Sequence, residues 1–322
     1  MDAAGFCRQT RVFIVAGKGG VGKTTVSAAL ARMAANAGLD TLLVDVDGTG
    51  GLAGAFGRPG PLTYDEVVLT PGGGGGGGGG EVRARTLTPD DALIEYLEGH
   101  GMARISKRLV ATGAIDVVAT AVPGIKDILV LGKVKQLERR SVADVIVVDA
   151  PAAGHAVTFL SSASGLLDAV SVGPIRAQAE DVADLLGDAD RCQVLLVTLP
   201  EETPVNEAVD TAYALEDRVG VSLAPVVVNG LYPPLEGLDA DPTAAAAEAG
   251  VTLRPGEAEA LAAAAGFRAH RTALQGDQVE RLATALPLPQ LRLPLLFTTD
   301  VGPAEVDRLA DALADAVGAL PS

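Results

Sequence analysis

Residues 17–25 read GKGGVGKTT and fit the phosphate-binding pattern G-x-x-x-x-G-K-[ST], with a second lysine, Lys18, directly after the first glycine. The glycines let the backbone wrap closely around phosphate oxygens, so that successive N–H groups point at the anion. Lys23 is expected to reach the β- and γ-phosphates of a nucleotide, and the Thr24 hydroxyl to bind Mg²⁺. Because 39 of the 322 residues are glycine, the flanking sequence has to support this interpretation.

The flanks of this loop have the pattern that a phosphate-binding loop requires. Before it, residues 12–15 (VFIV) form an apolar run suited to a buried parallel strand. After it, Val26, Leu30, Met33 and Ala37 recur at the spacing of one helix face. A strand, a glycine loop and a helix N-terminus together form an anion site, through oriented amides and the helix dipole. We therefore expect 17–25 to bind the phosphates of a nucleotide.

Composition limits the class of protein. The chain is 48% hydrophobic and 3% aromatic, with no Trp and a formal net charge of −16. Such an acidic surface repels nucleic acid and anionic lipid, so both are poor partner candidates. Two cysteines, Cys7 and Cys192, suggest neither a disulfide framework nor a C-x-x-C metal site. With no signal peptide and no apolar run of membrane-spanning length, the sequence predicts a cytoplasmic protein without direct membrane insertion.

Apolar runs of strand length alternate with helical patterns. They lie at 11–16, 40–46, 144–149, 193–199, 224–229 and 291–297. This alternation predicts an α/β fold with a doubly wound, mainly parallel sheet, in which ligands bind beyond the carboxyl ends of the strands. We expect a single domain over 1–322.

Two segments interrupt the alternation. Pro71 and the nine glycines that follow it join two β-like runs, so 71–80 is predicted to be an enlarged hairpin loop, with a phosphate cradle as the alternative. Residues 89–140 are predicted to be a helical insertion, with helices opening at Pro89 and Pro123 and another over 102–111. Two interpretations of the insertion are open. Its helices either pack with one face and are solvated on the other, or they offer a nucleotide-responsive surface to a partner.

Acidic residues stand at two strand ends. Asp45 lies in the run 40–46, and Asp47 follows directly at the mouth of that strand. A carboxylate there could hold the attacking water, bind Mg²⁺ through water, or cap the next turn. Asp149 ends the hydrophobic run 144–149, which is the arrangement of a Walker B strand that holds magnesium. Beyond it, the backbone of Gly154 could contact the γ-phosphate and change shape when that group leaves.

The doubled-lysine loop, together with Asp47 and Asp149, resembles the deviant Walker A P-loop ATPases, a group that includes ParA, MinD, the nitrogenase iron protein and ArsA. Residues 149–155 (DAPAAGH) resemble the second switch of ArsA and of the ATPases that target tail-anchored proteins. Segments 173–178 and 197–201 look most like the bacterial ArsA-like anion-transporting ATPases, which often occur as paralogous pairs. The resemblance implies a P-loop NTPase fold, with ATP and Mg²⁺ as ligands.

The resemblance also implies roles for individual residues. Lys18 matches the signature lysine that reaches across a dimer interface to the partner's phosphates. Asp47 matches the first-switch aspartate that positions the hydrolytic water, and Asp149 and Gly154 match the second switch. The nucleotide-binding set implied by the loop and the resemblance is Gly17, Lys18, Gly19, Gly20, Val21, Gly22, Lys23, Thr24, Thr25, Gly154, Asn229 and Pro294. The expected catalytic residues are Lys18, Lys23 and Asp47, and the expected metal site is Thr24, Asp47 and Asp149.

Asn229 and Pro294 carry the adenine site in this resemblance: Asn229 matches an asparagine that reads the adenine edge, and Pro294 a proline that lines the pocket. Some features of the family are missing. The first switch reads DGTGG at 47–51 instead of Asp-Pro-Ala-His-Ser. The cysteines that bind arsenite and the C-x-x-C zinc clasp have no counterpart, so a dimer would have to close differently.

The sequence therefore predicts a Mg²⁺-dependent ATPase that acts as a dimeric nucleotide switch. The dimer is expected to be a homodimer or a heterodimer with a paralogous ArsA-like ATPase, acting on an anion-transport or client-targeting partner through the helical insertion. One alternative is a positioning scaffold like ParA or MinD, which the acidic helix pattern over 303–319 disfavours. Another is an inactive nucleotide-binding subunit of an ATPase pair, suggested by the unusual first switch.

Overall fold

The computed structural model describes residues 1–46, 48, 51–73, 79–99, 101–102, 104, 124–151 and 153–321, without the side chains of 153–155. Most of the helix expected over 102–111, and its neighbour's start at Pro123, lie outside these residues. The helices bounding the insertion are present on either side of that gap.

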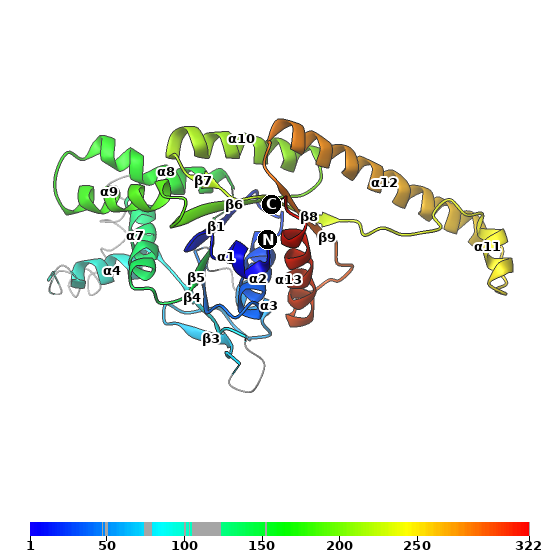
Figure 1. The fold of residues 1–322 in the computed structure, drawn as a ribbon, viewed down its shortest axis with the longest axis horizontal. Helices are drawn as coiled ribbons and strands as arrows, with labels where there is room; N and C mark the ends of the chain where they lie inside the picture. Colours follow the sequence, from blue (N-terminus) through cyan, green and yellow to red (C-terminus); the bar gives the residue numbers. More distant parts are fainter. Residues whose placement is uncertain are drawn as a thin grey trace.

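One sheet forms the centre of the protein (Figure 1). Within the described part of the chain its strand order is β3-β4-β2-β5-β1-β6-β8-β9, with the short β7 beside β6. The strands are β1 (Val12–Ala16), β2 (Thr41–Asp45), β3 (Val67–Thr70), β4 (Val82–Thr86), β5 (Val145–Asp149), β6 (Cys192–Thr198), β7 (Ser222–Leu223), β8 (Val226–Leu231) and β9 (Gln290–Pro294). Every pairing is parallel except that of β3 with β4. The predicted α/β fold class is confirmed.

Helices cover both faces of the sheet (Figure 1). They are α1 (Ala3–Cys7), α2 (Lys23–Asn36), α3 (Gly51–Ala55), α4 (Pro89–Gly99), α7 (Ile125–Arg139), α8 (Ala153–Ala169), α9 (Pro174–Gly187), α10 (Glu202–Val219), α11 (Pro242–Glu248), α12 (Glu257–Ala285) and α13 (Pro303–Gly318). Helices α1, α2, α3 and α13 pack on one face. Helices α7 to α10 and the end of α12 pack on the other, so the sheet is buried on both sides.

Strand β1 shows how the two faces are built. Phe13 and Val15 point to the layer of α2 and α13, whereas Val12, Ile14 and Ala16 point to the layer of α7 and α8. All five are buried, because alternate side chains of a strand face opposite sides of a sheet that is covered on both. This explains why the run reads as continuously apolar in the sequence.

Two strands, β3 and β4, flank the glycine tract, whose predicted loop lies partly outside the described residues. β3 and β4 pair antiparallel, with an irregularity in the register between Val68 and Thr70. Gly73 N–H donates to the Gly79 carbonyl at 2.9 Å, which extends the pairing into the glycine tract. β4 in turn lies parallel to β2, so the hairpin adds an edge to the sheet at the side of the second strand.

The C-terminal helices differ in how much of their surface is covered. α13 buries Val306, Leu309 and Leu313 against the layer of α2, and its Asp307 pairs with Arg32 at 2.6 Å. Its apolar face is therefore occupied by its own domain. α12 runs away from the sheet and carries α11 at its far end (Figure 1). None of the described helices combines the length and apolarity needed to cross a bilayer.

Candidate nucleotide site

The glycine loop of residues 17–22 connects the carboxyl end of β1 to the start of α2. Gly22 is the N-cap of this helix and provides no side-chain hydrogen bond to its first turn. Lys23 begins the helix and is buried, with 9% of its surface exposed. Because the first N–H groups of a helix lack partners within the helix, this end of α2 is a suitable anion site.

Gly22 has a left-handed backbone, with φ of 91° and ψ of 28°. A Cβ atom there would lie 2.4 Å from Nδ2 of Asn229, so both conformation and space require glycine. Asn229 comes from β8, and its Nδ2 donates to the carbonyl of Val21 at 2.9 Å. This hydrogen bond ties the loop to β8, a contact that the sequence did not predict.

The adenine-reading role of Asn229 stays a prediction, since one donor of its amide is used by the loop in this structure. Pro294 ends β9, the neighbour of β8, where it lies in register with Leu231. The carboxyl ends of β8 and β9 thus bring Asn229 and Pro294 to the same edge of the sheet as the loop.

Asp149 lies at the end of β5, beside the first turn of α2. Its Oδ2 accepts a hydrogen bond from the Thr24 hydroxyl at 2.7 Å, and its Oδ1 accepts one from the Ser27 hydroxyl at 3.1 Å. Burial raises the pKa of Asp149 to about 6, against the opposing effect of these two hydrogen bonds. Ser27 was missed in the sequence, although its place four residues after Lys23 puts it near the same helix face.

A second buried carboxylate stands beside Asp149. Asp45 ends β2 and is the register partner of Asp149 on β5. Its Oδ1 accepts a hydrogen bond from Gly48 N–H at 2.8 Å, and its charge adds to the upward shift of the pKa of Asp149. The charge of Lys23 acts in the opposite direction and lowers that pKa. Two acids and one lysine therefore share this strand edge.

The oxygen donors here fit magnesium. Mg²⁺ prefers hydroxyl, carboxylate and water oxygens, and typically takes only one or two ligands from the protein beside substrate phosphates. Thr24 and Asp149 are already in contact and supply such oxygens. Among the residues that the structure describes, no group of three or more His, Cys, Asp or Glu side chains could hold a metal ion by itself.

Two predicted switch residues can be placed only in part. Asp47 lies outside the described residues, so its roles toward water and Mg²⁺ stay predictions. Gly154 lies in the first turn of α8, which begins directly after β5 and Asp149. The segment around the first switch is near the loop, since a Cβ on Gly51 would lie 3.1 Å from Cγ2 of Thr24.

Lys18 points toward α10. Its Nζ lies 2.6 Å from Oε1 of Glu207, in an ion pair whose side chains are 41% and 39% exposed. No local pattern in the sequence points to Glu207, because the pair joins residues 189 positions apart. In this structure, Lys18 is therefore held by its own chain.

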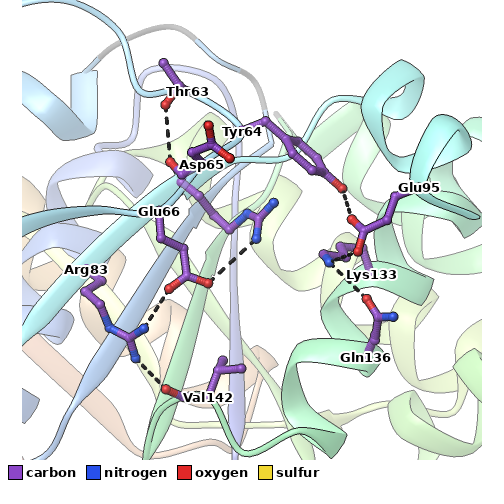
Figure 2. A network of polar contacts seen from close by, with 10 residues as sticks. Thr63, Tyr64, Asp65, Glu66, Arg83, Glu95, Lys133, Gln136 and Val142 are labelled. Carbon is purple, nitrogen blue, oxygen red and sulfur yellow. Dashed lines mark hydrogen bonds and ion pairs between the residues drawn. The ribbon is translucent and has the colours of Figure 1, made fainter. Parts of the chain in front are cut away.

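A polar network links the hairpin edge to the insertion (Figure 2). The Tyr64 hydroxyl donates to Glu95 on α4, and Glu95 also accepts from Lys133 on α7. The Arg85 guanidinium lies 4.3 Å from the centre of the Tyr64 ring. Burial alone would raise the pKa of Glu95, but the hydrogen bonds from Lys133 and Tyr64 lower it, so this carboxylate is ionised at neutral pH.

The strand order, the loop and the acid at the end of β5 define a P-loop nucleotide-binding α/β protein. Comparison with known families agrees. The family described as the CobQ/CobB/MinD/ParA nucleotide binding domain (CbiA) matches residues 12–318, and the chain belongs to this family.

Its relatives carry ATPase names. The chain is 33% identical over 310 residues to the ATPase BagA of Mycobacterium tuberculosis, covering 88% of this chain and 87% of that protein. It is 27% identical over 218 residues to the arsenical pump-driving ATPase of Acidiphilium multivorum, 65% of this chain and 33% of that protein. It is 23% identical over 269 residues to the ATPase GET3B of Arabidopsis thaliana, 70% of this chain and 65% of that protein. The chain is thus an ATPase of the ArsA/GET3 type.

Proposed function

We propose that the protein is a magnesium-dependent nucleotide switch that works as a dimer. It hydrolyses ATP to ADP and phosphate and passes the conformational change to an anion-transport or client-targeting partner. In this proposal the whole chain acts as one ATPase domain, with the insertion at 89–140 as its output.

One observation carries the proposal: Thr24 and Asp149 are in hydrogen-bond contact at the N-terminus of α2, next to the buried Lys23. The loop amides and Lys23 would bind the phosphates, and Thr24 and Asp149 would hold Mg²⁺, which supplies charge stabilisation on the phosphoryl oxygens. Asp47 would position the attacking water. Loss of the γ-phosphate would then be felt by the backbone at Gly154, at the start of α8.

Lys18 supports the dimeric form of the proposal. A lysine at this place has no phosphate role in its own subunit while it pairs with Glu207 on α10. Because both side chains are partly exposed, the pair is worth at most about 1 kcal/mol and can be exchanged for a stronger contact. We propose that the phosphates of a second ATPase subunit provide that contact.

The network of Figure 2 supports the output through the insertion. Tyr64 lies in the segment that follows α3, and Glu95 and Lys133 lie on the two helices that bound the insertion. A movement of that segment would therefore be transmitted to α4 and α7 through one shared carboxylate. Two related proteins bear names that refer to an arsenical pump and to GET3, which are candidate settings for such an output.

A positioning scaffold and an inactive subunit are the alternatives. The scaffold would need a surface for DNA or lipid, and the amphipathic α13 is not available for that purpose, since its apolar face packs in the layer of α2. The inactive subunit would bind ATP without hydrolysing it. The unusual first switch at 47–51 is the observation that favours the inactive subunit.

The test is ATP hydrolysis by the Lys23→Ala variant, measured as phosphate release by the purified protein with Mg²⁺. We expect a loss of at least about a hundredfold, because the lysine stabilises the charge on the transferred phosphoryl group. Lys126→Ala, the same change on α7, should hydrolyse ATP at the rate of the unchanged protein. Equal rates for Lys23→Ala and the unchanged protein would contradict the assignment of the site. ATP binding without hydrolysis in the unchanged protein would instead favour the inactive subunit.

The partner can be sought with an ATP-locked Asp47→Asn protein used as bait. If Asp47 positions the attacking water, this variant keeps ATP bound and the dimer closed. A paralogous ATPase or a client should then co-purify with the variant in ATP but not in ADP. Recovery of the same proteins with both nucleotides would contradict a nucleotide-dependent partnership.

A further inference from the structure

A cavity lies away from the nucleotide site. It has a volume of about 410 Å³ and lies between α4, α7 and α9, with none of the residues 17–25, Asp149 or Asn229 among its described lining. Its size is within the range of small-molecule sites, which is roughly 300–1,000 Å³. The proposed ATPase cycle uses Glu95 and Lys133 of its lining to link helices, but it assigns no ligand to the cavity.

The lining of the cavity is rich in charge. The charged residues among its described lining are Glu95, Lys133, Lys135, Arg139, Arg140 and Asp181. Four cations face two carboxylates, so these described residues carry a formal excess of two positive charges in a chain whose net charge is −16. A local excess of positive charge on an otherwise acidic protein attracts small anions and focuses them at that place.

The existing ion pairs do not neutralise this excess. Asp181 is shared by two cations: its Oδ2 lies 2.6 Å from Lys135 and its Oδ1 lies 3.0 Å from Arg139. Hydrogen bonding from Lys135 holds the pKa of Asp181 low, so it is ionised at neutral pH. No carboxylate of the described residues pairs with Arg140.

The two lysines of the lining are buried, and each keeps donors beyond its ion pair. Lys133 and Lys135 are only 8% and 7% exposed, and each has one carboxylate partner. A lysine ammonium has three donors, so each of these groups can donate further hydrogen bonds. Gln136 and Gln178 line the same space and add amide groups that suit carboxylate or phosphate oxygens.

We propose that this cavity binds a small dianion, with carboxylate or phosphate groups, between α7 and α9. Two negative charges match the excess of the lining. Arg140, together with Arg139, which shares Asp181 with Lys135, lies exposed at the end of α7, where both guanidinium groups can close on the ligand. The volume admits a small metabolite and excludes nucleic acid or a protein segment with its own fold.

The experiment is calorimetric titration of succinate and of inorganic phosphate into the full chain saturated with Mg·ADP at low ionic strength. Bound ADP occupies the glycine loop, and the two probes separate a carboxylate ligand from a phosphate ligand. We expect at least one probe to bind with one site per chain. Arg139→Gln/Arg140→Gln should weaken that binding about tenfold or more, since it removes two charge-assisted contacts. Arg218→Gln/Arg308→Gln, which removes the same charge from exposed positions on α10 and α13, should leave it unchanged.

A third variant separates charge from fold. Asp181→Asn removes one negative charge from the lining, which raises the positive excess by one, and should tighten binding about threefold. If the arginine variant weakened binding only by disturbing the fold, Asp181→Asn should disturb the same ion pairs. Both variants would then bind the probe more weakly than the unchanged protein. The proposal is overturned by that result, by equal affinity in the cavity and control variants, or by no heat of binding for either probe up to about 10 mM, the limit of weak affinity.

Discussion

Nζ of Lys18 lies 2.6 Å from Oε1 of Glu207, so the second residue of the phosphate loop is paired with α10 of its own subunit. Both side chains are partly exposed, which limits the pair to at most about 1 kcal/mol. A contact of that strength orients the Lys18 side chain but is easily broken. Such a weak ion pair suits a lysine that has to change partner when a second subunit binds.

Replacement of Glu207 by Gln should release Lys18 without harming the fold. We expect the free energy of unfolding to change by less than about 1 kcal/mol. ATP-dependent dimerisation should become several-fold tighter, because Lys18 no longer has to leave a partner before it crosses the interface. Sedimentation velocity with Mg·ATP, over a range of protein concentrations, measures this.

Asp210→Asn is the matched control, because it removes one acid three residues further along α10. Its dimerisation should equal that of the unchanged protein. Lys18→Ala should bind nucleotide normally but dimerise more weakly. If the unchanged protein and the Glu207→Gln, Asp210→Asn and Lys18→Ala variants all dimerise with the same affinity, Lys18 has no role between subunits.

The raised pKa of Asp149 predicts a pH-dependent stability. The pKa is about 6 in the folded protein against an ordinary value of 3.8. The protein loses stability as the pH rises from 3.8 through 6, because the unfolded carboxyl ionises before the folded one does. The loss for this one group is roughly 3 kcal/mol.

Asp149→Asn should remove that decline. Urea unfolding of the nucleotide-free protein between pH 4 and pH 8 measures it: the variant should gain stability relative to the unchanged protein as the pH rises, while losing ATP hydrolysis. Asp144→Asn, an exposed acid just before β5, should leave the pH profile as it is. If the difference in free energy of unfolding between Asp149→Asn and the unchanged protein stays constant from pH 4 to pH 8, the pKa of Asp149 is not raised in the folded protein.

The sequence predicted the framework because its signals are local. Continuously apolar runs such as 12–15 mark strands buried on both faces, and the loop pattern fixes where β1 ends and α2 begins. The acid at the end of β5 was predicted on the same ground. Its contact with Thr24 then follows from the order of parallel strands.

The contacts that the sequence did not reveal join distant segments. Glu207, Asn229 and Tyr64 act on the loop or the insertion across long stretches of chain. Each is a common polar residue on a helix, strand or loop, and only the packing of the layers selects its partner. Sequence periodicity describes which face of an element is buried, but not which polar groups meet at its ends.

Gly22 and Asn229 should be energetically coupled. Gly22→Ala would force alanine into a left-handed backbone, at about 1–2 kcal/mol, and would push Nδ2 of Asn229 away from the Val21 carbonyl, at about 1 kcal/mol more. Once Asn229 is Ala, only the backbone cost remains. A double-mutant cycle by urea unfolding should therefore give a coupling of about 1 kcal/mol. Strict additivity would show that Asn229 does not support the loop.

Tyr64→Phe should weaken the link between the hairpin edge and the insertion. It removes the hydrogen bond to Glu95 but keeps the ring beside Arg85, so we expect a loss of about 1 kcal/mol in the free energy of unfolding. Hydrogen exchange of α4 should also respond less to nucleotide. Tyr213→Phe removes an exposed hydroxyl bond to the Ala285 carbonyl and serves as the control. An unchanged nucleotide response in Tyr64→Phe would remove this network from the proposed output.

The glycine tract should be tolerant in its middle and intolerant at its end. A Cβ on Gly80 would lie 2.1 Å from the Leu39 carbonyl oxygen, and Gly80 N–H donates to the Ala35 carbonyl at 2.8 Å. The Gly80 backbone cannot move away from Leu39 without losing its hydrogen bond to Ala35. Gly80→Ala should therefore lower the free energy of unfolding by about 2–3 kcal/mol. The nearest atom to a Cβ on Gly72 is 3.4 Å away, so Gly72→Ala should stay within about 0.5 kcal/mol.

Removing four glycines from 74–77 should likewise leave stability and ATP hydrolysis almost unchanged, since the free energy of closing a loop depends only weakly on its length. Urea unfolding and phosphate release measure the three variants side by side. A large loss of hydrolysis in the shortened protein would favour the phosphate cradle over the hairpin loop. Equal stability of Gly80→Ala and Gly72→Ala would show that the contact of Gly80 with the end of α2 does not hold the hairpin in place.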